Sequence, residues 1–206
     1  MVEPGRLRRT VLTVAALNLG YFWVEVAVAL AIGSVSLLAD SVDFLEDTSI
    51  HLLIFLALGW PLARRALAGR VMALLVLVPA LAAAWAVFRK AGDPVPPDVL
   101  ALVATAGGAA MVNGVAAWLV SGVRHHGGSL SRAAFLSARN DVLVNLAIIA
   151  MGVVTLWTRS GWPDIVLGAL IVVLNVGAAR EVWEAATEER LAARALAGEQ
   201  IEDRPG

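Results

Sequence analysis

The chain has 206 residues, of which 59% are hydrophobic and 16% are charged, and its formal net charge is -1. Soluble domains carry roughly 25% charged residues, so this composition excludes an ordinary soluble domain, and the sequence offers no basic patch for nucleic acid. Because the chain lacks cysteine, disulfides and thiolate metal ligands are excluded as well.

Six apolar stretches follow one another along the chain. Each is long enough to cross a hydrocarbon core of about 30 Å as a helix of roughly 17 to 25 residues. They cover residues 11–32, 35–59, 71–88, 99–120, 133–157 and 165–182. We therefore predict an all-α polytopic membrane protein, a six-helix transmembrane bundle over residues 11–182. Residues 1–10 would form a cytosolic N-terminal segment, and residues 183–206 a short cytosolic tail that continues the last helix without forming a separate domain.

Positive charge orients this bundle. An even number of spans puts both termini on one side, and most of the arginines lie on that side or in its loops: Arg6, Arg8, Arg9, Arg64, Arg65, Arg70, Arg124, Arg132, Arg180, Arg190, Arg194 and Arg204. The opposite side carries Arg89, Lys90 and Arg159. By the positive-inside rule, both termini are expected to lie in the cytoplasm. We expect an integral membrane protein, located in the inner (plasma) membrane of a bacterium.

The second span carries acids where the bilayer tolerates few. Asp43, Asp47 and His51 advance by i, i+4, i+8, so they share one helix face. Ionised side chains at membrane depth are costly and mark ion or proton pathways. Two carboxylates one turn apart can direct their oxygens at a single cation.

The fifth span repeats this period with Ser137, Asp141 and Asn145. Counting inward from the cytoplasmic ends, Asp47 and Asp141 both lie about 18 Å deep at 1.5 Å per residue, so we expect the two helices to face one another. Span ends are uncertain by about two to four residues. A stagger of one turn, which sets Asp43 opposite Asp141, therefore remains open.

Asp43, Asp47 and Asp141 together form a predicted site for a divalent cation. Three carboxylates this close cannot all stay ionised in a low dielectric without a cation, so they would bind protons when the metal is absent. Competition between metal and protons at one site is the minimum requirement for antiport.

Two segments resemble a known family. Residues 33–47 read GSVSLLADSVDFLED, preceded by Asn18 and Glu25, and residues 137–145 read SARNDVLVN. The first segment resembles the SLALLADAxHxLxD pattern in the second helix of the cation diffusion facilitators, a family of divalent metal exporters. The second resembles the HxxxD pattern of their fifth helix. The resemblance implies metal ligands at Asp43, Asp47, Asp141 and the position of Ser137.

This chain departs from the family pattern at two of those positions. Asp43 and Ser137 stand where zinc-transporting members often have histidine. The resulting oxygen environment suits manganese, iron or magnesium better than a histidine-containing zinc site. The family resemblance keeps zinc among the candidates. The transported cation is expected to be zinc, manganese, iron or cobalt, with no permanently bound cofactor. The resemblance also implies a homodimer, and a short form without the cytosolic ferredoxin-like domain of many members.

Several other polar residues could assist the site. Asn18, Asn140, Asn145 and His51 are candidate accessory groups. With an unperturbed pKa of about 6.5, His51 would suit a proton relay or an access site, although a purely structural role is the alternative. His125 and His126 are weak candidates for metal capture. Asp40 is interpreted as structural, bonded to backbone or to Asn18.

Two rival functions come from other classes. Asp40 and Asp43 match the first half of the DxxDG motif of magnesium-dependent membrane phosphotransferases, but Phe44 stands where that motif needs glycine and no second acidic pair follows. A degenerate, non-transporting membrane scaffold, with Ser137 marking a lost ligand, is the other alternative.

Overall fold

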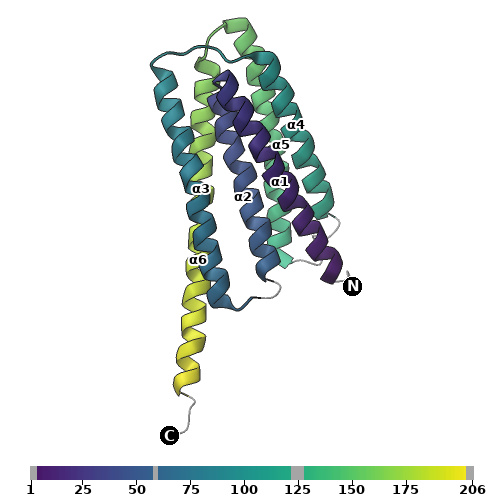
Figure 1. Ribbon diagram of the computed structural model, residues 1–206, viewed down its shortest axis with the longest axis vertical. Helices are drawn as coiled ribbons and strands as arrows, with labels where there is room; N and C mark the ends of the chain where they lie inside the picture. The colour runs from purple at the N-terminus through teal and green to yellow at the C-terminus, as the bar shows by residue number, and fades with distance from the viewer. Residues whose placement is uncertain (1–3, 58–59, 122–127, 203–206) are drawn as a thin grey trace.

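A computed structural model of the protein describes residues 4–57, 60–121 and 128–202. Within these ranges the chain is all-α, as predicted. The six helices are α1 (Pro4–Ile32), α2 (Val35–Ala57), α3 (Leu62–Ala91), α4 (Val99–Ser121), α5 (Gly128–Thr158) and α6 (Trp162–Glu202). Both termini lie at the same end of the bundle (Figure 1), as an even number of spans requires.

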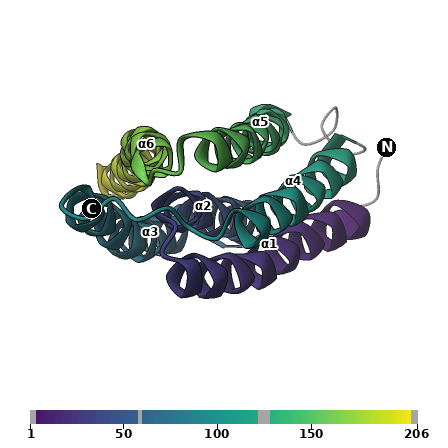
Figure 2. The same ribbon diagram turned by 90° about the horizontal axis from the view of Figure 1, so that it is seen from above.

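Helix α2 occupies the centre of the bundle. Viewed along the helices, it lies between α1 on one side and α5 and α6 on the other (Figure 2). It packs against α1, α3, α5 and α6, whereas α4 packs against α1 and α5. The contact between α2 and α5 agrees with the pairing that their matching polar stripes predict.

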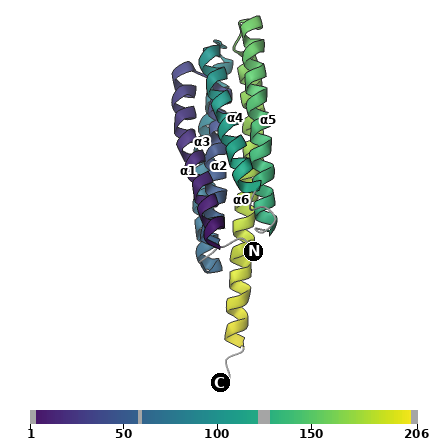
Figure 3. The ribbon, with the colours of Figure 1, turned by 90° about the vertical axis from the view of Figure 1, so that its right-hand side faces the viewer.

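Four stretches within the described residues are long and apolar enough to cross a membrane: Arg8–Ile32, Leu67–Ala91, Val99–Ser121 and Asn140–Thr158. Helix α2 is excluded from this group by its four acidic residues, and the apolar part of α6, Trp162–Gly177, is shorter. Helix α6 continues without a break to Glu202 and projects beyond the other helices (Figure 3). The helix therefore includes most of the predicted tail, as far as Glu202.

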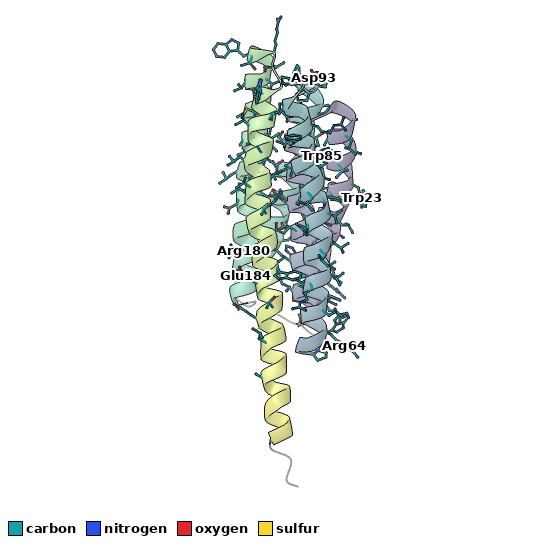
Figure 4. The ribbon with its side chains drawn as sticks, turned by 90° about the vertical axis from the view of Figure 1, so that its left-hand side faces the viewer. Trp23, Arg64, Trp85, Asp93, Arg180 and Glu184 are labelled. Carbon is teal, nitrogen blue, oxygen red and sulfur yellow. The ribbon has the colours of Figure 1, made fainter. Side chains whose placement is uncertain are left out.

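The outer surface of the bundle is apolar. Trp23 is 64% exposed and Trp85 61% exposed, and both side chains point away from the neighbouring helices (Figure 4). Large exposed aromatic side chains suit contact with lipid rather than water. Polar side chains are instead gathered inside, including Asn18, Glu25 and Asp40, each 0% exposed. Soluble proteins show the opposite distribution, with polar side chains outside and apolar ones inside. The distribution seen here is consistent with a membrane as the solvent.

A tight turn and a distant acid fix the start of α2. Gly33 adopts a φ of 67°, a left-handed conformation that glycine reaches without a steric penalty, and α1 ends there. The Asp164 carboxylate of α6 then accepts hydrogen bonds from the backbone N–H groups of Val35, at 2.9 Å, and Ser36, at 3.1 Å. An acid at this position also interacts favourably with the helix dipole.

Lys90 of α3 completes this junction. Its Nζ lies 2.8 Å from Asp164 Oδ2 and donates to the Gly33 carbonyl at 2.6 Å. The side chains are 10% exposed for Lys90 and 1% exposed for Asp164. Ser34 and Ser36 donate their hydroxyls to the same carboxylate at 2.8 Å and 2.6 Å. One buried acid therefore joins α3, α6 and the α1–α2 turn.

We expect the substitution Asp164→Ala to destabilise the protein strongly. Removing one partner of a buried ion pair costs about 3–5 kcal/mol because the other charge stays buried without compensation. The melting temperature of the purified protein in detergent micelles should therefore fall.

Glu184→Ala is the matched control, because it breaks the Arg180–Glu184 pair of α6, whose side chains are 79% and 55% exposed. Exposed pairs contribute little to stability, so the melting temperature should stay unchanged. Equal melting temperatures for the two variants would contradict the anchoring role of Asp164.

Candidate metal centre

The predicted ligands come from the two helices that the sequence paired. Asp43 and Asp47 lie on α2, and Asp141 lies on α5. Asp43 interacts electrostatically with Asp141 and Asp47, and Asp141 interacts with Asp47 in turn. The structure thus brings together three acids that are separated by up to 98 positions in the sequence. Their mutual repulsion in the interior of the bundle calls for a positive partner.

Helix α1 contributes an amide to this group. Asn18 Nδ2 donates to Asp47 Oδ2 at 3.3 Å, and both side chains are buried. The bond restricts the Asp47 carboxylate while leaving its other oxygen outside this contact. Asn18 is therefore an orienting group next to a predicted ligand.

His51 lies one turn further along α2. Its Nδ1 is 2.6 Å from the Asp47 carbonyl oxygen, and the side chain is 1% exposed. When Nδ1–H donates to this carbonyl, Nε2 carries the free lone pair, and Nε2 has no hydrogen-bond partner among the described residues. A backbone carbonyl that fixes one ring nitrogen is the usual arrangement for a histidine that binds a metal or a proton through the other.

Helix α5 supplies the remaining predicted groups. Asn145 is buried and its Nδ2 donates to the Asp141 carbonyl at 2.9 Å, whereas Asn140 is exposed. Ser137 belongs to α5, but its side chain lies outside the described part of the structure, and so do His125 and His126. The role of Ser137 as a ligand stays a prediction.

The three carboxylates do not form a closed coordination shell. Among the residues that the structure describes, no three Asp, Glu or His side chains converge closely enough to hold one ion. A full shell in this region would need rotation of side chains, water, or the hydroxyl of Ser137.

One feature of the site contradicts the sequence interpretation, and another was not identified from the sequence. Asp40 was expected to bond to backbone or to Asn18, but neither of its oxygens has a hydrogen-bond partner in the described residues, and Asn18 bonds to Asp47. That expectation is wrong because Asn18 lies beside a later turn of α2.

Asn175 of α6 was not identified from the sequence as part of the site. Its Nδ2 donates to the Ala39 carbonyl at 2.8 Å, and a buried amide inside an apolar span was the available signal.

Comparison with known proteins identifies the family. The model of the cation efflux transmembrane domain matches residues 11–188. The chain belongs to this cation efflux family. It is also 28% identical over 200 residues to the zinc transporter ZitB of Escherichia coli (strain K12), with 88% of this chain covered. The zinc transporter ZitB of Shigella flexneri matches with the same identity and coverage.

Family membership confirms the resemblance carried by the second and fifth helices, and it places the chain among transport domains of the membrane rather than among enzymes. The magnesium-dependent phosphotransferase is thereby excluded. The chain spans 60% of the length of the two curated relatives.

Proposed function

We propose that the protein moves divalent metal cations out of the cytoplasm, in exchange for protons, through a site formed by Asp43, Asp47 and Asp141. The observation that carries this proposal is the meeting of these acids between two helices at the core of the bundle, where they interact electrostatically. Membership of the cation efflux family supports it. The wall of a transport site, unlike a structural metal site, must bind the ion and also release it.

Charge explains how metal and protons would exchange. A divalent cation compensates most of the negative charge of the three carboxylates, and its departure leaves that charge buried without a partner. Protons entering from the opposite side would then neutralise the same oxygens. Each step keeps the interior near neutrality, so the helices can change their packing with either cargo bound. The empty, fully ionised state is the costly one, which couples the two fluxes.

The donor set bears on the choice of ion. The three acids and the Asn18 amide offer oxygen ligands, which suit manganese and iron, while carboxylates also accept zinc and cobalt. Two relatives are named zinc transporters. We propose that zinc and manganese are both carried. We also propose that His51 Nε2 binds an ion or accepts a proton on the cytoplasmic side of Asp47. A homodimer is proposed as the transporting unit.

Replacement of either central acid tests this function. Asp47→Ala and Asp141→Ala should each lower zinc or manganese flux into proteoliposomes more than about tenfold, because each removes a charged ligand. Proton counterflow, followed with a pH-sensitive dye, should fall in parallel.

Asp98→Ala provides the control, since this exposed acid caps the start of α4 through the Ala101 N–H at 2.9 Å. Its flux should match that of the wild type. Unchanged flux in Asp141→Ala would remove this residue from the site, and the absence of any flux in the wild-type protein would favour the scaffold.

The identity of the fourth ligand can be tested by restoring an imidazole. Ser137→His should raise the ratio of zinc flux to manganese flux, because nitrogen ligands favour zinc over manganese. The ratio is measured in competition assays with both ions present. An unchanged ratio would place Ser137 outside the coordination shell.

The proposed orientation predicts a labelling pattern. Because the natural chain has no cysteine, single cysteines can be introduced at two exposed positions at opposite ends of the bundle, Asp93→Cys and Glu188→Cys. In intact spheroplasts a membrane-impermeant maleimide should label the first variant and spare the second. The reverse pattern would place the termini outside the cytoplasm.

A further inference from the structure

A second pair of acids lies inside the bundle next to the proposed ligands, and both members interact electrostatically with Asp43. Glu25 of α1 and Asp40 of α2 are both 0% exposed. Asp40 precedes Asp43 by three residues, which is about 4.5 Å of helical rise, on the side of Asp43 away from the termini. Neither acid has a role in the site described above.

The oxygens of this pair lack partners. The Asp40 carboxylate lies against the Glu25 carboxylate and the Asn145 amide. When both acids are ionised, neither can donate to the other, so all four carboxylate oxygens and Asn145 Oδ1 are buried and without a hydrogen bond in the described residues. Asn145 Nδ2 is already engaged with the Asp141 carbonyl, which leaves the amide oxygen available to a ligand.

Nearby groups do not supply the missing positive charge or donor. Tyr21, which interacts electrostatically with both acids, donates its hydroxyl to the Thr105 carbonyl at 2.6 Å. The buried lysine that the structure describes, Lys90, pairs with Asp164. Two ionised carboxylates buried side by side without a positive partner are strongly unfavourable. The three neighbouring side chains offer five oxygens and neither an imidazole nor a sulfur ligand, which is the donor set that a hard divalent cation prefers.

We propose that Glu25, Asp40 and Asn145 form a second divalent-cation site, reached by the ion after the central acids and before the end of the bundle remote from the termini. The place of this site on a transport path rests on the proposed function, whereas ion binding there does not. Two cations held about one helical turn apart repel one another. Arrival of an ion at the second site would therefore weaken binding at the first, as in multi-ion conduction.

Counting bound manganese tests this site. Mn²⁺ alone is the probe, and the purified full-length protein in detergent micelles is titrated with it while free ion is followed by electron paramagnetic resonance. The wild type should bind two ions per chain, Glu25→Gln one, Asp141→Ala one, and the double variant none. Asp40→Asn should reproduce Glu25→Gln.

The melting temperature separates ion binding from a structural role. Glutamine has the shape of glutamate without its charge, so Glu25→Gln should melt at or above the wild-type temperature when metal is absent. Bound ligand stabilises the folded state, so saturating Mn²⁺ should raise the melting temperature less in this variant than in the wild type. Glu184→Gln, an exposed acid-to-amide change on α6, should match the wild type in both measurements.

Each outcome decides between the two sites. If Glu25→Gln binds as many ions as the wild type, or melts lower without metal, the second site is overturned and the pair is structural or shares a proton. A single wild-type ion that is lost in Asp141→Ala but kept in Glu25→Gln also overturns it and leaves the proposed function intact. An ion that is lost in Glu25→Gln and kept in Asp141→Ala supports the second site and contradicts the central one.

Discussion

The rest of the structure depends on the burial of α2, an acidic helix, at the centre of an apolar bundle. Lipid offers its carboxylates neither hydrogen bonds nor counter-charge, so four other helices surround it. Three of them present a buried asparagine to α2: Asn18 from α1, Asn145 from α5 and Asn175 from α6. Neutral amides of this kind fix positions without cancelling the negative charge, which leaves room for a mobile cation to do so.

The Asp164 junction fixes the start of the same helix, and its acid, unlike Asp40, is fully paired. There the acid has a lysine, two serine hydroxyls and two backbone N–H groups as partners. At Gly168, one turn later, α6 approaches the backbone of α2 so closely that an added Cβ would lie 2.9 Å from the Val35 carbonyl carbon. The fully satisfied acid is structural, whereas the acids of the proposed ion path have no lysine or serine partner of this kind among the interactions described above. Hydrogen-bond satisfaction, rather than acidity, distinguishes the two roles.

Along α2 the polar groups follow one another from His51 through Asp47 and Asp43 to Asp40, over about 16 Å of helix. Glu25, Asp141 and Asn145 meet this series from two neighbouring helices. A series of weak sites separated by about one turn suits passage better than a single tight site, because release requires an ion to find its next ligands nearby. Such a series also explains why the acids need not close into one coordination shell.

The sequence by itself determined the helices, their membrane character and the pairing of α2 with α5. Hydrophobic length and polar period are local properties, so the stretch 99–120 could be delimited to within one residue of α4, whereas 71–88 covers only part of α3. Only the tertiary structure decided which distant groups meet: Asp164 with Lys90, Asn18 with Asp47 rather than Asp40, and Glu25 with Asp40. Those contacts depend on how each helix is rotated and tilted against its neighbours, and helix rotation is set by the packing of all six helices together, which no local pattern records.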